Sequence, residues 1–288
     1  MSKRDLYPEQ HTIDTGPSRV WVGVRPGDGP PIVLLHGFPD DSTIYDRLTP
    51  LLSGRRVVTI DFAGYGLSPR EDRPWADQQR ETEVVAVLRE LDLTDVTLVG
   101  HDASLAVAIN VTLDQPELVG KLVLLNGYFH SDPALRLPDM IRLFGIHELD
   151  LLSDAMMEDP QQRQWLLGHS GRQFGIDASA PDNVAAHSIV PQYFGSADQP
   201  DARAAIRQWT ATLFPGMQDN DARVLEGDLR RASLPVVVAF GEDDPYLTPH
   251  IAANIGALFP SARVDGISGA SHWPQWDQPR ALAERILG

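Results

Sequence analysis

The feature that most constrains the fold is the stretch 96–108, which reads VTLVGHDASLAVA. It begins as a short apolar run and continues, after Gly-His-Asp-Ala-Ser, as small and apolar residues typical of a helix. A strand that turns sharply into a helix holds one side chain in a strained, exposed position, and the residues two before and two after it must be small. Gly100 and Ser104 meet this condition around Asp102. The stretch therefore predicts a strand–turn–helix that presents Asp102 as a reactive side chain.

Short apolar runs and helical segments alternate on both sides of this element. We expect strands at 11–14, 19–24, 32–35, 56–60, 121–125, 235–240 and 262–267, besides the strand that leads into Gly100. We expect helices at 42–52, 77–91, 249–259 and 277–287, besides the helix that follows Asp102. Because strands and helices alternate, the pattern predicts an α/β fold whose parallel strands are joined by right-handed crossovers.

The segment 128–229 interrupts this alternation and contains no convincing strand. Its pattern predicts helices around 138–144, 149–157, 161–167, 183–193 and 201–213, broken by Pro and Gly. We therefore expect a core domain formed by 1–127 and 230–288, with 128–229 as a helical cap. Such a cap is expected to lie over the carboxyl ends of the strands, where ligands bind in open α/β sheets.

Composition excludes several classes of function. The chain has 288 residues, a net charge of −16 and no cysteine. The acidic balance argues against nucleic acid and anionic membranes as partners, and no apolar run approaches membrane-spanning length. The absence of cysteine excludes disulfides and favours a cytoplasmic location. No His or carboxylate cluster has metal-ligand spacing and no phosphate-binding loop is present, so we expect no metal and no cofactor. A monomer or a homodimer is expected.

Two further candidate residues follow strands late in the chain. Gly-Glu-Asp-Asp-Pro after the strand 235–240 offers Asp243 or Asp244, and Ser-Gly-Ala-Ser-His-Trp-Pro after 262–267 offers His272. The order along the chain is therefore nucleophile, acid, histidine, which differs from the orders of the chymotrypsin and subtilisin types.

With His36-Gly37-Phe38-Pro39 and the loop 61–68, these motifs resemble the α/β-hydrolase superfamily, and within it the epoxide hydrolase and haloalkane dehalogenase branch. The resemblance spans nearly the whole chain. It implies an eight-stranded, mostly parallel sheet with a helical lid. It also implies Asp102 as nucleophile and His272 oriented by Asp244, which the family spacing favours over Asp243. The backbone N–H groups of Phe38 and Ala103 would form the oxyanion hole.

An aspartate nucleophile limits the reaction. A carboxylate that attacked an ester would give an anhydride, whereas attack on an activated sp³ carbon gives an ordinary ester. His272 would then activate the water that hydrolyses this ester. An epoxide leaves as an alkoxide and needs an acidic donor, whereas a halide needs N–H donors. Epoxide hydrolysis is our first hypothesis and haloalkane dehalogenation the alternative. A third possibility is a binding or non-hydrolytic biosynthetic protein with this fold.

The residues expected to contact the substrate follow from the same resemblance. Tyr193 is the cap tyrosine that could donate a proton, and the second donor is left open among Tyr128, His169, His187, Trp165 and Trp209. His36 flanks the oxyanion loop and is also included. Ala103 stands where relatives carry Trp or another large residue, and Phe38 stands where many dehalogenases carry Asn. Both differences count against halide release, and Ala103 suggests a roomy site for an apolar, bulky small molecule.

Overall fold

The computed structural model describes residues 3–70, 79–177, 180, 182–197 and 199–288, and an eight-stranded sheet forms its centre. The strand order is β1-β2-β4-β3-β5-β6-β7-β8. Strands β2 and β4 each pair antiparallel with a neighbour, and every pair from β4 through β8 is parallel. The predicted eight-stranded, mostly parallel sheet is confirmed. The strands are β1 (Glu9–Asp14), β2 (Arg19–Arg25), β3 (Gly29–Leu35), β4 (Arg55–Asp61), β5 (Val96–Asp102), β6 (Val119–Gly127), β7 (Val236–Gly241) and β8 (Ala262–Ile267).

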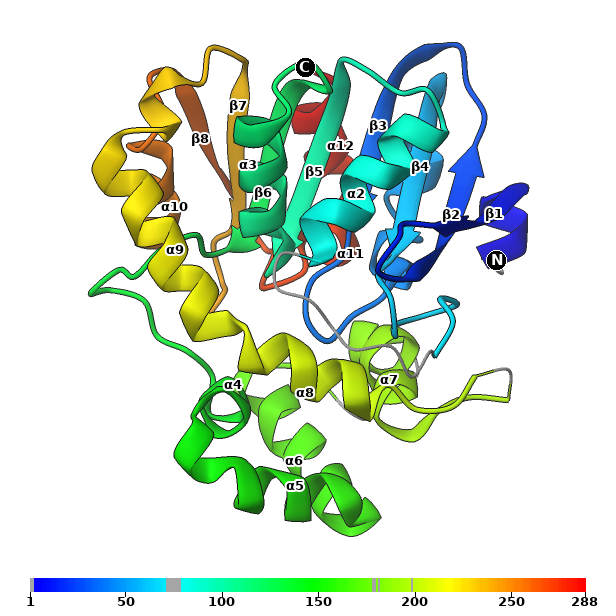
Figure 1. Cartoon of the computed structure of the whole chain (residues 1–288), viewed down its shortest axis with the longest axis vertical. Helices are drawn as coiled ribbons and strands as arrows, with labels where there is room; N and C mark the ends of the chain where they lie inside the picture. The colour runs from blue at the N-terminus through cyan, green and yellow to red at the C-terminus, as the bar shows by residue number, and fades with distance from the viewer. Residues whose placement is uncertain (1–2, 71–78, 178–179, 181, 198) are drawn as a thin grey trace.

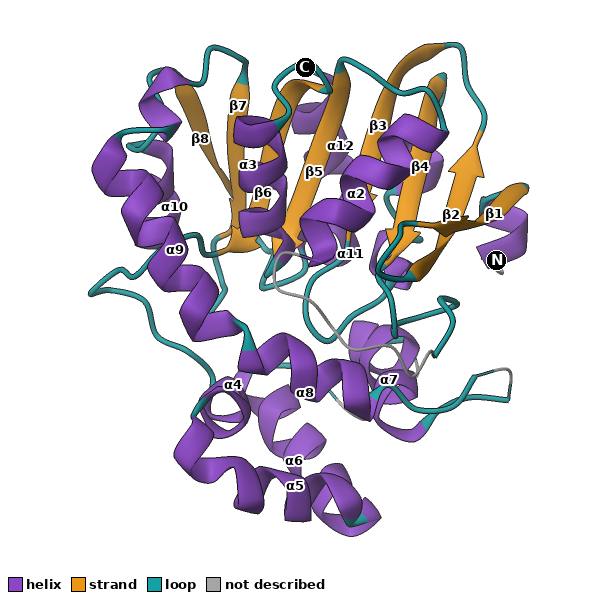
Figure 2. Ribbon diagram, viewed as in Figure 1, coloured by secondary structure: helices purple, strands orange, loops and turns teal. Residues whose placement is uncertain are grey.

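Helices cover both faces of this sheet, which explains why its central strands are apolar throughout. Figures 1 and 2 show α2 (Gln79–Glu90) and α3 (Ser104–Asp114) in front of the strands and α12 (Pro279–Leu287) behind them. Every residue of β7 is buried, and so are five of the seven residues of β5, including Gly100 and His101. A strand buried on both faces cannot alternate apolar with polar residues, so it appears as a continuous apolar run.

Three expected helices differ from those observed. The segment 42–52 forms two 3₁₀ turns, Ser42–Tyr45 and Thr49–Leu51, because Pro50 lacks the N–H that a continuous helix would need. The expected helix 277–287 is observed as α12, which begins at Pro279, and Asp277 ends a separate short helix, α11 (Pro274–Asp277). The two helices are separate because Pro279 disfavours the helical conformation at Gln278. Residues 79–90 of the expected helix 77–91 form α2, whereas its first two residues, Asp77 and Gln78, lie outside the described residues.

All elements of regular structure between β6 and β7 are helices, and the described residues of this segment contain no strand. Figure 1 shows α4 to α8 gathered beneath the carboxyl ends of the parallel strands, which is where the sequence predicts a cap. The elements are α4 (Asp139–Gly145), α5 (Asp150–Glu158), α6 (Pro160–Gln173), a π-helical segment (Ala185–Ile189) that continues into α7 (Val190–Phe194), α8 (Arg203–Ala211) and α9 (Leu213–Glu226).

Helix α9 was not predicted beyond Leu213. Pro215 lies in its first turn, where the missing N–H of proline costs no helical hydrogen bond, so a residue that often ends helices is tolerated here. The distal part of α9 returns to the core and contacts α3. Arg223 pairs with Asp114 at 2.8 Å, and Asn220 accepts a hydrogen bond from Asn110 at 3.2 Å. The last part of the predicted cap is therefore packed against the core.

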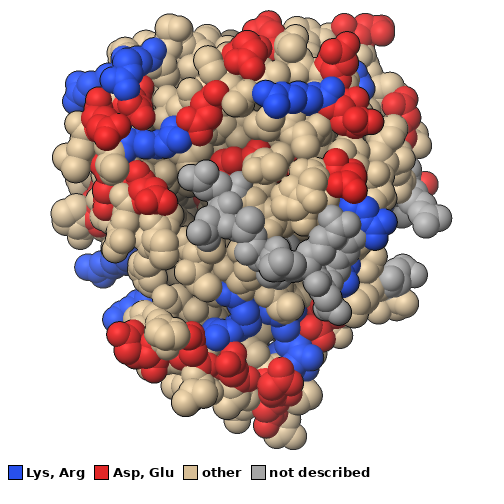
Figure 3. All heavy atoms as spheres, viewed as in Figure 1, with Lys and Arg blue, Asp and Glu red and all other residues tan. Residues whose placement is uncertain are grey.

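The acidic excess is not gathered into one patch on the face that Figure 3 shows, where acidic and basic side chains are intermixed. Among the described residues, no helix is both long enough and apolar enough to cross a membrane.

Candidate active site

The turn between β5 and α3 holds Asp102 with a φ of 52°, in the left-handed region that residues other than glycine rarely adopt. Close packing explains the small neighbour at position 100, because a Cβ on Gly100 would lie 2.5 Å from the carbonyl oxygen of Ser104. On the other side of the turn, the Ser104 hydroxyl donates a hydrogen bond to the carbonyl of His36. The sharp turn predicted around Asp102 is therefore present, and it is bonded to the loop that follows β3.

Two further glycines leave room for this turn, and this role was not predicted from the sequence. A Cβ on Gly37 would lie 2.5 Å from the Cβ of Asp102, and a Cβ on Gly127 would lie 2.4 Å from its carbonyl oxygen. Each glycine lies at the carboxyl end of a buried strand or just beyond it, β3 and β6 respectively. A glycine at a strand end is common in turns, so only the tertiary contact with Asp102 reveals why these positions exclude a side chain.

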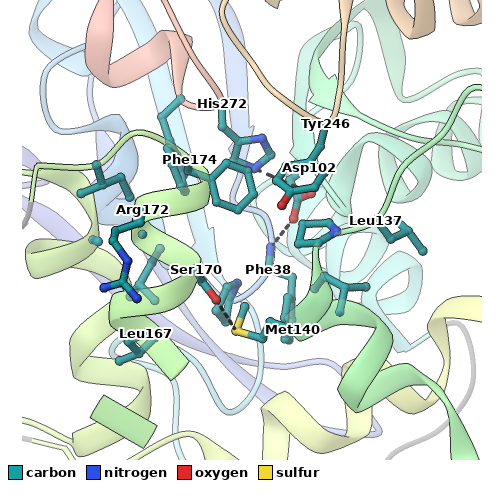
Figure 4. A pocket seen from close by; sticks show the side chains of 18 of the residues that line it. Phe38, Asp102, Leu137, Met140, Leu167, Ser170, Arg172, Phe174, Tyr246 and His272 are labelled. Atoms are coloured by element: carbon teal, nitrogen blue, oxygen red, sulfur yellow. Dashed lines mark hydrogen bonds and ion pairs between the residues drawn. The ribbon is translucent and has the colours of Figure 1, made fainter. Parts of the chain in front are cut away.

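The carboxylate of Asp102 is held by backbone N–H groups. The N–H of Phe38 donates to Oδ2 at 2.8 Å (Figure 4). The backbone N–H of Ala103 also favours the charged form of this carboxylate. Burial raises the pKa of Asp102, although the charge of His272 and the two N–H groups oppose the rise. The two residues predicted to form an oxyanion hole thus lie at the carboxylate of the predicted nucleophile.

His272 lies between two carboxylates. Its Nδ1 is 2.7 Å from Oδ2 of Asp244, and its Nε2 is 3.9 Å from Oδ1 of Asp102. Asp243 is exposed, so Asp244 is the acid that the structure brings to the histidine. Burial disfavours the charged imidazole, but the charges of Asp244 and Asp102 outweigh it and raise the pKa of His272 to about 9.

Asp244 is ionised because several donors surround it. It accepts hydrogen bonds from the Asn126 side chain at 2.9 Å and from the backbone N–H groups of Tyr246 and Leu247 at 2.9 and 3.0 Å. Burial opposes ionisation, yet His272 and these donors lower the pKa of Asp244 to about 2. Asn126, on β6, was not predicted. Its own oxygen accepts the N–H of Gly241 at 2.7 Å, so it links two strands as well as the acid.

A cavity of about 550 Å³ opens over Asp102 and His272, between the core and the cap. Its walls are mainly apolar, with Met140 and Leu137 from the segment around α4 and Leu167 from α6, as Figure 4 shows. Cavities of roughly 300–1,000 Å³ accommodate drug-sized molecules. Ala103 also lines the cavity.

Two of the predicted substrate contacts, Tyr128 and Trp209, line this cavity. Tyr128 follows Gly127, which pairs in register with Asp102 across β5 and β6. No described residue forms a hydrogen bond with the Tyr128 hydroxyl. The ring of Trp209 packs edge-on against that of Phe38, with centroids 5.8 Å apart. Tyr246, which the sequence analysis did not select, lines the cavity as well.

The other three predicted contacts lie elsewhere. Tyr193 is fully buried inside the cap, where its hydroxyl donates to the sulfur of Met140 at 3.1 Å, and it is absent from the cavity lining. Trp165 is 56% exposed and stacks on His169, so it faces outward from α6. His36 is buried behind the oxyanion loop. Neither His169 nor His187 lines the cavity. Sequence periodicity does not show which side of a cap helix faces the core.

The hydrogen bonds of His36 stabilise the loop that follows β3. Its Nε2 accepts the N–H of Phe62 at 3.0 Å, so the proton is on Nδ1, which donates to the carbonyl of Gly37 at 2.8 Å. Burial lowers the pKa of His36 to about 4, which keeps the ring neutral. In the part of the chain that the structure describes, no three His, Asp or Glu side chains are arranged to hold a metal ion.

Comparison with known proteins agrees with this architecture. The pattern of the alpha/beta hydrolase family matches residues 32–285. A haloalkane dehalogenase of Mycolicibacterium paratuberculosis is 31% identical, across 100% of this chain and 89% of its own length. The bifunctional epoxide hydrolase 2 of Sus scrofa is 24% identical, and the match covers 92% of this chain but only 52% of that protein. The structure of the epoxide hydrolase CorEH superimposes with a TM-score of 0.73 at 19% identity, over 97% of this chain and 96% of that one.

Proposed function

Because the chain belongs to the alpha/beta hydrolase family, we propose that it hydrolyses an epoxide through a covalent ester on Asp102. The observation that carries this proposal is the carboxylate at the turn. Its Oδ2 is bonded by the N–H of Phe38, while Oδ1 faces His272 across 3.9 Å. Oδ1 is therefore the oxygen available to attack carbon, and Oδ2 becomes the carbonyl oxygen of the ester.

In the first step, Oδ1 of Asp102 attacks one carbon of the epoxide and the bond from that carbon to the ring oxygen breaks. The electron pair goes to this oxygen, which takes a proton from a donor in the cavity. We assign that donor as Tyr128, because it lines the cavity beside Asp102. Burial, with a further contribution from the charge of Asp102, raises the pKa of Tyr128, so the phenol is protonated before the attack.

In the second step, a water molecule gives a proton to Nε2 of His272 and attacks the ester carbon of Asp102. The negative charge that develops on Oδ2 meets the N–H groups of Phe38 and Ala103. When the carbon–oxygen bond breaks, the departing alkoxide takes the proton from His272 and Asp102 is left as a carboxylic acid. The proton of this acid passes through water to the Tyr128 tyrosinate. The product is a vicinal diol, and the carboxylate is restored.

Ester formation also prepares His272 for this second step. The negative charge of Asp102 is one of the charges that raise the pKa of His272. Esterification removes that charge while Asp244 is unchanged. The pKa of His272 therefore falls in the covalent intermediate, and the imidazole loses its proton more readily when a base is needed.

Dehalogenation is the second candidate, and two observations favour it. The dehalogenase of M. paratuberculosis is 31% identical over the full chain, and Trp209, a residue type whose indole carries an N–H, lines the cavity. A halide is a weak base that needs hydrogen bonds but no proton, so Tyr128 would not be required. The two reactions share the ester on Asp102 and differ in the donor to the leaving group.

The experiment that tests the proposal traps the ester. His272→Gln should slow the second step, so incubation with an epoxide should add the whole mass of the epoxide to the protein. An alkyl halide should instead add the mass of its alkyl group. Intact-protein mass spectrometry and peptide mapping would place the adduct on Asp102. The double variant Asp102→Asn/His272→Gln is the matched control and should give none. If neither substrate class labels the single variant, no ester forms on Asp102 and the proposal is wrong.

A further inference from the structure

A buried ion cluster lies behind the loop that carries Phe38, outside the lining of the cavity. It consists of Lys3 on α1 (Lys3–Leu6), Asp41 in the loop after β3 and Asp61 at the end of β4. The ammonium nitrogen of Lys3 is 2.9 Å from Oδ2 of Asp61 and 3.4 Å from Oδ2 of Asp41. The Lys3 side chain is only 13% exposed, and that of Asp61 is completely buried. We call these three residues the Lys3 cluster.

Phe38 lies between two tethers of its loop. On one side, the Ser104 hydroxyl donates a hydrogen bond to the carbonyl of His36. On the other side, Oδ1 of Asp61 accepts the backbone N–H of Ser42 at 2.8 Å. A displacement of Asp61 would therefore move one end of the loop and change the direction in which the N–H of Phe38 points.

Asp41 joins the same loop to the cap. Its backbone N–H donates to the Ser188 hydroxyl at 2.9 Å, and its Oδ2 accepts a hydrogen bond from the Gln192 amide at 3.1 Å. Both partners are buried, Ser188 in the π-helical segment and Gln192 in α7. The Lys3 cluster therefore contacts the oxyanion loop directly and the cap through Asp41.

Lys3 is the only cation that pairs with these two carboxylates among the described side chains. Burial disfavours the charged ammonium, but the charges of Asp41 and Asp61 outweigh it and raise the pKa of Lys3. Burial also disfavours an ionised Asp61, yet its pKa is lowered, and Lys3 contributes most to this lowering. Without the ammonium, two buried like charges would face each other, which is unfavourable where the dielectric constant is low.

We propose that Lys3 is a positioning residue for hydrolysis of the ester on Asp102. Its ammonium holds Asp61 and Asp41, and through them the loop that directs the N–H of Phe38. The proposal rests on the function proposed above and applies to either leaving group, because both reactions form this ester. Negative charge develops on Oδ2 only in the second step, so a displaced Phe38 should slow this step more than the first.

The chain supplies a matched control, because Lys3 and Lys121 are the only lysines among its 24 basic residues. Lys121 lies near the amino end of β6, opposite the edge of the sheet that carries the site. Its ammonium donates to the carbonyls of Arg285 and Ile286 at 3.3 and 2.9 Å, and it pairs with no carboxylate among the described residues. Lys121→Met therefore removes an ammonium without affecting the loop.

Rapid-quench mass spectrometry of single turnovers measures ester formation and ester hydrolysis separately, with whichever substrate labels His272→Gln. Lys3→Met should slow hydrolysis by about tenfold near pH 8, less than the roughly 10²–10³-fold lost when an oxyanion donor is removed outright. Ester formation should change by less than about threefold, so the ester should accumulate. Lys3→Arg keeps the charge and should return hydrolysis to within about threefold of the wild type. Lys121→Met should change neither step.

The other titratable groups that face Asp61 are His36, Tyr7, Arg70 and Asp46. His36 is neutral, and burial raises the pKa of Tyr7, so its phenol is neutral as well. Arg70 is charged but forms no ion pair with Asp61 in the described part of the chain. Only Asp46, whose pKa burial raises to about 7, titrates in the range where Asp61 would titrate without Lys3.

A pH profile separates positioning from a general loss of stability. The ratio of wild-type to Lys3→Met hydrolysis rates should increase from pH 5 to pH 8, because Asp61 ionises within this range only when its cation is missing. Lys3→Met/Asp61→Asn should lose this pH dependence. If the dependence persists in the double variant, Asp46 is responsible and the proposal is wrong.

NMR spectroscopy of lysine labelled with ¹³C at Cε tests the cluster without turnover, since the chain gives only two lysine signals. The pKa of Lys3 should lie above that of Lys121, which burial lowers, and should decrease in Asp61→Asn. A Lys3 that titrates below Lys121 would overturn the proposal whatever the reaction is. Hydrolysis of the ester at the wild-type rate in Lys3→Met would also overturn it, while leaving the function of Asp102 intact.

Discussion

The two walls of the cavity are held in place in different ways. On the core wall, Asp102, Asp244 and Phe38 follow strands of the sheet, and buried hydrogen bonds of 2.7–3.0 Å fix their positions. On the cap wall, the side chains are mostly apolar or small, such as Met140, Leu167 and Ala186. The groups to which we assign the reaction are thus held by the sheet, whereas the cap supplies most of the apolar surface around the cavity.

Asp102→Asn should produce the largest effect, because it removes the nucleophile from the core wall. We expect kcat to fall by roughly 10⁴-fold or more, as when nucleophiles of other hydrolases are removed. Asn tolerates the left-handed conformation that φ = 52° requires, so the fold should persist. Steady-state turnover with freshly purified protein, checked by mass for deamidation back to Asp, makes the measurement. Substantial residual activity would show that the reaction does not need this carboxylate.

Two Tyr→Phe substitutions test which wall of the cavity supplies the proton donor. Tyr128→Phe, at the core wall, should slow epoxide opening by roughly 10²–10³-fold, the contribution typical of general acid catalysis. Tyr193→Phe should change it less than about threefold, because that hydroxyl contacts Met140 inside the cap and contributes only a weak hydrogen bond. Single-turnover rates of adduct formation in the His272→Gln background isolate this step. The opposite order of effects would assign the acid to the cap, and equal small effects would favour halide release.

The ion pair of His272 and Asp244 gives a pH-dependent prediction. The pKa of His272 is raised to about 9, so its contribution to stability is complete below its usual value near 6.5 and is lost as the pH rises through 9. Asp244→Asn should remove the largest part of this contribution, whereas the charges of Asp102 and Asp40 remain. We expect the deficit in unfolding free energy of the variant to shrink by about 2 kcal/mol between pH 6 and pH 10. Urea unfolding at both pH values measures it, and a deficit that is independent of pH would contradict the assignment.

Strand–helix alternation was enough to predict the sheet, and the resemblance to a known family predicted that Asp102, Asp244 and His272 would lie together. These features are local: buried strands are continuously apolar, and parallel strands place their carboxyl ends at one edge. The cap residues were predicted less well. Tyr193, Trp165 and Trp209 are all aromatic residues on amphipathic helices, and only one of the three lines the cavity.

The sequence by itself determined the fold and the sharp turn that carries Asp102, for which Gly100 and Ser104 leave room. The tertiary structure decided which donors and which charges share the cavity with it. Tyr128 lines the cavity because Gly127 lies beside Asp102 in the sheet, whereas Met140 faces the cavity in place of Tyr193. Such outcomes depend on how each cap helix is rotated against the core, and helical periodicity leaves that rotation undetermined.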